Sequence, residues 1–212
     1  MKERPIVFTG EMVRAILDGR KSQTRRVVKP QPPQGASLVE FGPHDHISEF
    51  HRNKLHWFVA EADDLWPCER EDCICCPYGQ PGDRLWVREA FAYRYFTSDD
   101  PITEKSLVAY RADGESQEGV IEFTPAIYMP RWVSRITLEI TNIRVERVQD
   151  ISEGDAIAEG IQRSNSSTFN LMGPNRALFS ELWDSINDKP GKKCSWEDNP
   201  WVWVIEFKKI KP

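Results

Sequence analysis

The stretch Gly19–Arg26, which reads G-R-K-S-Q-T-R-R, decides how the rest of this chain is interpreted. Apolar residues recur at helical spacing between positions 12 and 17, so a short helix is expected over 10–18. Thr9 is a suitable N-cap for this helix, and Gly19 stands where a glycine commonly ends one. Five cations and no acid lie between positions 19 and 31. A basic segment therefore follows the helix directly, and its plainest interpretation is a solvated turn.

Outward from this segment, alternating or continuous apolar runs predict strands at 5–8, 84–89, 107–110, 134–148 and 201–207. The alternation in 134–148 shifts by one residue at Asn142, which predicts a bulge or bend in a long strand. A capping-box pattern at Ser152 opens a helix over 153–159, and Pro174 begins a longer one. Strands and helices do not alternate regularly, so an α+β fold built on a small mixed β-barrel is favoured over a doubly wound sheet.

Residues 31–79 differ from the rest of the chain. The run Pro30–Gly35 is rich in residues that break regular structure, and periodicity beyond it is weak. We interpret 31–79 as a loop-rich insertion, with room for one hairpin, into a barrel domain formed by 1–30 and 80–212. A structureless loop of this length is uncommon in a compact domain, so something is expected to hold it in place.

Four of the five cysteines crowd into the insertion, at Cys68, Cys73, Cys75 and Cys76. An odd number of cysteines without a secretory signal argues against a disulfide framework. Three or four of these thiolates, together with a histidine such as His56, would suit a single structural zinc ion. A set of free, reduced cysteines is the alternative.

The bulk composition narrows the class of protein. Hydrophobic residues make up 40% of the 212 residues and charged residues 29%, which is enough apolar material for a packed core. No apolar run reaches the length of a membrane span, and the run at 6–8 is too short for a signal peptide, so we expect a cytoplasmic protein without a membrane partner. With a net charge of −5, the molecule as a whole does not attract polyanions, so any anion-binding face is expected to be a local basic surface.

Four elements, in this order, resemble the ASCH domains of the PUA-like superfamily. The signature G-x-K-x-x-T-x-R is matched by Gly19, Lys21, Thr24 and Arg26, and the family's second element resembles 150–161. The dipeptide Gly82-Asp83 and the strand 201–207 resemble later elements of PUA-like barrels, and the chain as a whole is similar to the ASCH proteins of phages and prophages. The resemblance implies a PUA-like barrel with flanking short helices and a cleft for a nucleobase, nucleoside or RNA.

The resemblance also implies a reaction. Small ASCH proteins hydrolyse N4-acetylcytidine with a lysine, a threonine and a glutamate, and the matching positions here are Lys21, Thr24 and Glu159. In this chemistry the lysine activates the threonine hydroxyl, and the glutamate protonates the departing amine. Burial and cationic neighbours would lower the pKa of the lysine enough for it to act as a base. No cofactor is required for this reaction.

Two other classes of function remain open. One is a binding module for RNA or a modified base, in which a basic segment holds phosphate and an aromatic side chain stacks on a base. The phosphate contacts would come from Arg20, Lys21, Arg25, Arg26 and Lys29, and the stacking from Trp86, Tyr93 or Trp132. Each of these aromatic side chains could equally be part of the core. The other class is a structural or interaction protein whose insertion carries the function.

Overall fold

The computed structural model describes residues 1–32, 36–39, 54–59, 74–93, 108–114, 120, 122–162 and 173–210, and it describes side chains for all of these except 36–39, 54–59 and 74. The strands are β1 (Glu3–Val7), β2 (Gln23–Val27), β3 (Ala36–Val39), β4 (Lys54–Val59), β5 (Ile74–Cys75), β6 (Arg84–Arg88), β7 (Phe91–Tyr93), β8 (Val108–Tyr110), β9 (Thr137–Arg147) and β10 (Trp201–Ile210). The α-helices are α1 (Gly10–Leu17), α2 (Glu153–Ala158) and α3 (Pro174–Asn187).

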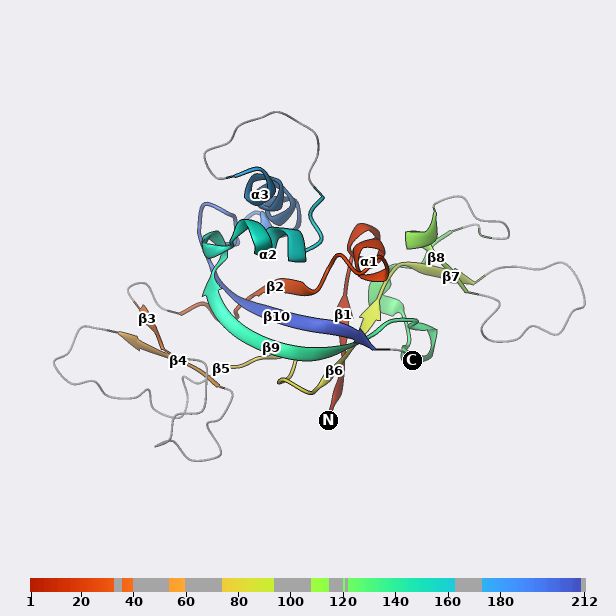
Figure 1. Ribbon diagram of the computed structural model, residues 1–212, viewed down its shortest axis with the longest axis horizontal. Coiled ribbons are helices and arrows are strands. Elements are labelled where there is room, and N and C mark those ends of the chain that lie inside the picture. The colour runs from red at the N-terminus through yellow and green to blue at the C-terminus, as the bar shows by residue number, and fades with distance from the viewer. Residues whose placement is uncertain are drawn as a thin grey trace, which may run out of the picture.

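A five-stranded mixed sheet forms the centre of the molecule, in the order β1-β6-β9-β10-β2 (Figure 1). β1 runs parallel to β6, and the other neighbours are antiparallel. The α+β class predicted from the sequence is confirmed. The sheet is not closed into a barrel, because β1 and β2 are its two edges. Arg26 of β2 reaches from one edge toward the other, and its Nη2 donates a hydrogen bond of 2.7 Å to the carbonyl of Val7.

The apolar run of β10 is buried on both faces, as its sequence predicts. Because successive side chains of a strand point to opposite faces, the run divides between two cores. Trp203 and Ile205 belong to the larger core, which also contains residues of α1, β6 and β9. Val202 and Val204 belong to a second core beneath α2 and α3. β10 therefore joins the two halves of the hydrophobic interior.

The predicted irregularity in the long strand β9 is confirmed. Glu206 of β10 pairs with Asn142, whereas Phe207 pairs with Ile140, so β9 has one extra residue at Thr141. A bulge of this kind increases the local twist and bends the strand. Figure 1 shows β9 and β10 curving together beneath the helices.

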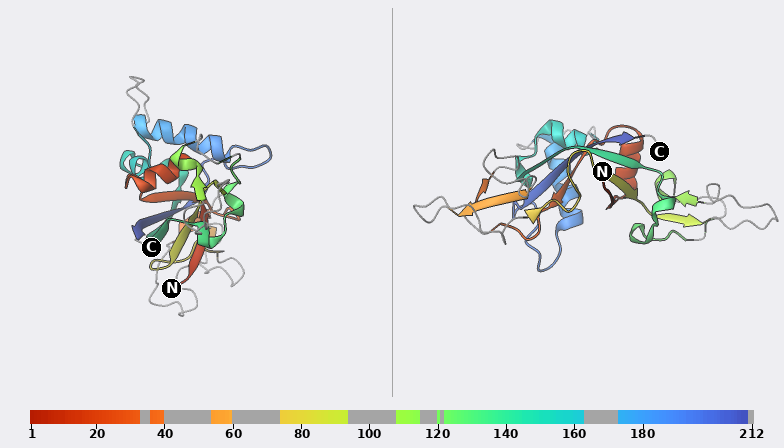
Figure 2. Two further views of the ribbon diagram at one scale, coloured as in Figure 1. Left: turned by 90° about the vertical axis from the view of Figure 1, so that its right-hand side faces the viewer. Right: turned by 90° about the horizontal axis from the view of Figure 1, so that it is seen from below.

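The predicted helix ends are also confirmed. The hydroxyl of Thr9 accepts a hydrogen bond from the main-chain N–H of Met12 at the start of α1. α2 begins with a complete capping box between Ser152 and Asp155. Both figures of the whole chain show α2 and α3 on the same side of the sheet (Figures 1 and 2).

In the part of the chain that the structure describes, no helix combines the length and the apolar character needed to cross a membrane.

Two small sheets lie apart from the central one. β3, β4 and β5 form a three-stranded antiparallel sheet within the predicted insertion, and β7 pairs with β8. Figures 1 and 2 place β3 and β4 at one end of the molecule and β7 and β8 at the other. The hairpin suggested by the sequence is therefore present as β3 and β4. The repeated Ser, Asn and Gly residues of 164–174 predict a loop, and this stretch lies outside the described residues up to position 172.

Candidate functional site

A buried ion pair joins the basic segment to the end of α2. Lys21 Nζ donates a hydrogen bond of 2.7 Å to Glu159 Oε2 and another of 2.8 Å to the main-chain carbonyl of Glu159. The Lys21 side chain is 0% exposed and that of Glu159 is 4% exposed. The structure thus brings together two of the three residues that the sequence placed in a catalytic group.

The backbone on both sides of this pair explains its position. After α1, the main-chain N–H groups of Arg20 and Lys21 both donate to the carbonyl of Ala15, which turns the chain back toward the helix. Gly160 follows Glu159 with a φ of 94°, a conformation that favours glycine. The absence of a side chain on Gly160 lets α2 approach Ala15 and Lys21 closely. Two turns therefore hold Lys21 and Glu159 against each other.

Burial lowers the pKa of Lys21. The ion pair and hydrogen bond with Glu159 oppose this change, and the positive charges of Arg26 and Arg25 add to it. This lowering of the Lys21 pKa has the direction expected from the sequence, in which burial and cationic neighbours favour the neutral amine. Arg20 does not take part, because its guanidinium pairs with Asp18 at 2.8 Å and donates to the carbonyl of Gly160.

Arg25 is the buried centre of a second group of charges, whose other members Glu146, Asp155 and Arg144 are partly exposed. Its side chain is 1% exposed, and it pairs with Glu159 at 3.2 Å, with Asp155 at 3.5 Å and with Glu146. Arg144 joins the same carboxylates, at 3.1 Å from Glu146 and 3.2 Å from Asp155. Buried charges are tolerated when each has partners of the opposite sign, and this group meets that requirement. Most of the hydrogen-bonding capacity of Arg25 is therefore used within the protein.

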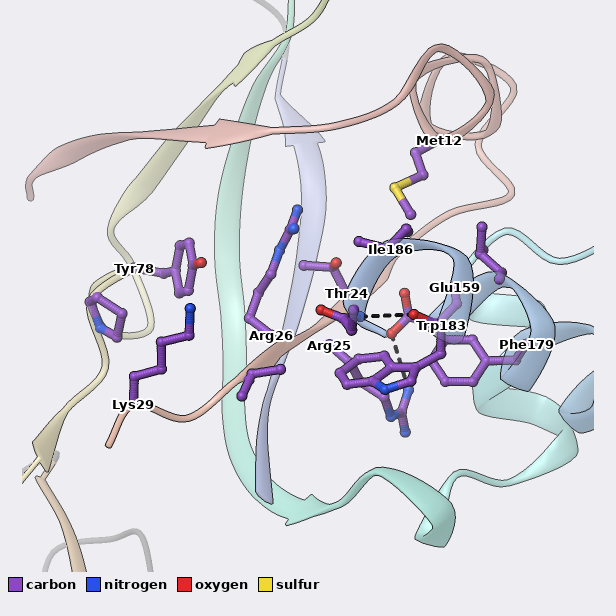
Figure 3. Close-up of a pocket in the computed structure, with 14 residues that line it drawn as sticks. Met12, Thr24, Arg25, Arg26, Lys29, Tyr78, Glu159, Phe179, Trp183 and Ile186 are labelled. Atoms are coloured by element: carbon purple, nitrogen blue, oxygen red, sulfur yellow. Dashed lines mark hydrogen bonds and ion pairs between the residues drawn. The ribbon is translucent and has the colours of Figure 1, made fainter. Parts of the chain in front are cut away.

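A pocket of about 270 Å³ opens beside this charged group (Figure 3). Its walls come from α1, β2, the segment before β6, the end of α2, and α3. Thr24 and Glu159 both line it, whereas Lys21 does not and lies enclosed behind Glu159. The lining consists of Met12, Thr24, Arg25, Arg26, Val27, Lys29, Pro77, Tyr78, Glu159, Phe179, Leu182, Trp183, Ile186 and Asn187.

The aromatic side chains predicted to stack on a base do not line this pocket. Trp86 is 8% exposed and lies beneath two guanidinium groups, with Arg88 at 4.6 Å and Arg131 at 5.9 Å from its ring. Trp132 is 58% exposed and stacks on Tyr93 with 6.1 Å between the ring centroids. The pocket instead has Tyr78, Phe179 and Trp183 in its walls. In the sequence, Trp183 shares one apolar helix face with Leu178, Leu182 and Ile186, and this spacing predicts packing rather than ligand binding.

The proposed zinc ligands are only partly described. Cys68 and Cys73 lie outside the described residues. Cys75 is exposed, whereas Cys76 is buried among the residues of the larger core. Burial raises the pKa of Cys76 to about 11, although hydrogen bonds from the main chain at Tyr78 and Gly79 oppose this change. Among the side chains that the structure describes, no three His, Cys, Asp or Glu residues are grouped to hold a metal ion.

Comparison with known proteins adds no family assignment. No protein-family model matches the chain, and neither the curated proteins nor the solved structures include a significant match. The chemistry of the pocket must therefore be argued from its own residues.

Proposed function

We propose that this chain is an ASCH-type protein of the PUA-like class whose pocket binds the base of a nucleoside and removes an acyl group from its exocyclic amine. The observation that supports the proposal is a single pocket whose lining contains Thr24, aromatic side chains and Glu159, the carboxylate that holds the buried Lys21 just behind the wall. Flat heterocycles suit such walls, because aromatic side chains stack on the faces of bases. The substrate proposed is N4-acetylcytidine.

The proposed reaction proceeds through a neutral form of the buried pair, reached when the proton of their hydrogen bond passes from Lys21 Nζ to Glu159 Oε2, so that Lys21 is an amine and Glu159 a carboxylic acid. Burial lowers the pKa of Lys21, which is the direction that this transfer needs. Thr24 Oγ1 transfers its proton to Lys21 Nζ and attacks the acyl carbon. The bond between the acyl carbon and N4 breaks, and N4 takes the proton of Glu159. Cytidine leaves, and the acetyl group remains as an ester on Thr24.

Water completes the cycle. The Glu159 carboxylate accepts a proton from water as the water oxygen attacks the ester carbon. The ester bond breaks, and the Lys21 ammonium returns a proton to the Thr24 oxygen. Acetic acid leaves and ionises in solution, and the pair is again neutral. Each proton-transfer role is expected to contribute about 10²- to 10⁴-fold in rate.

The test is release of acetate and cytidine from N4-acetylcytidine by the purified chain. Thr24→Ala should abolish turnover, and Lys21→Arg should also fail because an arginine does not act as a base at neutral pH. Ser22→Ala is the matched control, since Ser22 is exposed and its hydrogen bonds with Ala158 and Phe207 use only main-chain atoms. Equal turnover by Thr24→Ala and the unchanged protein would disprove the mechanism.

A binding module without turnover is the second candidate, and one observation favours it. Lys21 is fully enclosed and both of its side-chain hydrogen bonds go to Glu159, so the pair also satisfies itself as a structural contact. In that case the pocket would hold N4-acetylcytidine or a base in RNA and leave the acyl group intact. Recovery of the unchanged nucleoside from a saturable complex would identify this function and exclude the hydrolase.

A further inference from the structure

The five cations of the basic segment differ in how their charge is balanced. Arg20 pairs with Asp18, Lys21 pairs with Glu159, and the third cation, Arg25, lies among several carboxylates. These three cations are therefore neutralised inside the protein. The two that remain, Arg26 and Lys29, form no ion pair with any carboxylate of the described residues.

These two cations share the same pocket wall. The Arg26 guanidinium donates from Nη2 to the carbonyl of Val7 and lies 5.2 Å from the ring of Phe8, while its buried Nε has no hydrogen-bond partner among the described residues. Lys29 is exposed and lines the pocket two residues after β2. Arginine Nε atoms without a partner in the described part of the chain also occur outside the pocket, at Arg4, Arg84, Arg88 and Arg176, so the case for an anion rests on the unbalanced charge and the shared wall. Arg26 and Lys29 are thus positioned to receive an anion.

The pocket has two chemically different ends (Figure 3). Lys29 and Tyr78 lie at one end, with Arg26 between them and the rest of the pocket. Glu159, Trp183 and Phe179 lie at the other end. The only carboxylate among the described lining residues is Glu159, and it is already paired with Lys21 and Arg25. Its charge is compensated there, so the uncompensated positive charge of the pocket lies at the Lys29 end, and an anionic group would be favoured at that end.

We propose that Arg26 and Lys29 form a phosphate subsite, so that the natural ligand of the pocket is a phosphorylated nucleoside unit rather than a free nucleoside. A guanidinium and an ammonium are the two side-chain groups that bind phosphate most readily, and Tyr78 adds a hydroxyl donor at the same end. The phosphate can belong to a mononucleotide or to the backbone of a strand. The identity of the base rests on the proposed function, but the phosphate subsite does not.

The experiment compares the binding of four probes by calorimetry: N4-acetylcytidine, its 5′-monophosphate, a short RNA strand containing the acetylated base, and ribose 5-phosphate. The monophosphate or the strand should bind about 10- to 100-fold more tightly than the nucleoside, because charged hydrogen bonds are strong in partly buried sites. A preference for the strand assigns the phosphate to a polymer, and a preference for the monophosphate assigns it to a free nucleotide. The advantage should shrink as salt is raised.

Lys29→Gln should remove most of the phosphate advantage, so that the monophosphate or the strand binds little more tightly than the nucleoside. Arg26→Gln should do the same, but it also removes the contact with Val7, so Lys29 is the safer variant. Lys208→Gln is the matched control, because Lys208 lies at the opposite end of β10, paired with Glu139.

The outcomes separate the two proposals. Binding of ribose 5-phosphate that is lost in Lys29→Gln supports the subsite even if no nucleoside binds, and in that case only the proposed function fails. Nucleoside binding that gains nothing from a phosphate overturns the subsite and leaves the proposed function in place. Absence of binding by all four probes overturns both.

Discussion

Lys21 Nζ and Glu159 Oε2 lie 2.7 Å apart, and almost no solvent reaches either side chain. Removing one partner of a buried pair leaves the other charge without compensation. Glu159→Gln should therefore lower the free energy of unfolding by about 3–5 kcal/mol, measured by urea denaturation. Glu181→Gln, on the exposed side of α3, is the matched control and should change stability by less than about 0.5 kcal/mol. Equal stability of the two variants would show that the pair is not needed for folding.

Gly160 controls how closely α2 approaches the lysine. A Cβ at this position would lie 2.9 Å from Ala15 Cβ and 3.2 Å from Lys21 Cβ, and its φ of 94° strains any other residue. Gly160→Ala should destabilise the protein by about 2–4 kcal/mol, the sum of a backbone and a packing cost. The measurement is thermal or urea unfolding.

Two other glycines separate these costs. Gly191 has a φ of 79°, and a Cβ added there would have no atom within 4 Å, so Gly191→Ala should show the backbone cost of about 1–2 kcal/mol alone. Gly154 lies within α2 in open surroundings, and Gly154→Ala should be neutral or stabilising. If Gly160→Ala costs no more than Gly191→Ala, the close contact with Ala15 and Lys21 is unimportant.

The sequence predicted most of the elements because their signals are local. The capping box at Ser152, the shift at Asn142 and the apolar run of β10 each depend on a few neighbouring residues, and each appears where expected. Closure of the predicted barrel depends instead on whether the two edge strands pair with each other, which no local pattern reports. In the structure the edge strands β1 and β2 do not pair, and within the described ranges only the side chain of Arg26 joins them, by its hydrogen bond to Val7.

The basic segment was harder to interpret. Gln23–Val27 has no apolar alternation, yet it forms an edge strand because β10 offers it a partner, with Thr24 opposite Ile205. Its buried charge depends on carboxylates more than 100 positions away, among them Glu146 and Glu159. The aromatic wall was missed for a similar reason: periodicity places Trp183 on the apolar face of α3, but only tertiary packing decides whether that face meets core or pocket.

Asp155 should make stability depend on acidic pH. Burial alone would raise the pKa of Asp155, but hydrogen bonds from Ser152 and Gln23 and the charge of Arg25 outweigh it and hold the pKa below its ordinary value of 3.8. A carboxyl group whose pKa is lowered by folding stabilises the folded state at higher pH and loses this contribution as the pH falls through its folded value. The free energy of unfolding should therefore decrease below about pH 4.

Asp155→Asn should flatten this acid dependence, because the variant has no proton to take up at this position. The measurement is urea unfolding at several values between about pH 2 and 5. Asp188→Asn removes an exposed carboxylate after α3 and is the matched control. The same acid slope in Asp155→Asn and in the unchanged protein would remove Asp155 as its source.

Trp183 should report ligand binding directly. Its indole is 4% exposed, lines the pocket and donates from Nε1 to the carbonyl of Cys194 at 2.9 Å. A base stacked in the pocket should quench its fluorescence, and Trp183→Phe should lose most of that quenching. Binding should weaken by less than the about 1–3 kcal/mol that replacing a stacking side chain with alanine costs, because a phenyl ring still stacks on a base. Trp132→Phe is the control, since Trp132 is exposed and is not part of the pocket lining. If nucleoside binding quenches Trp183→Phe as strongly as the unchanged protein, the base binds elsewhere and the assignment of this pocket is wrong.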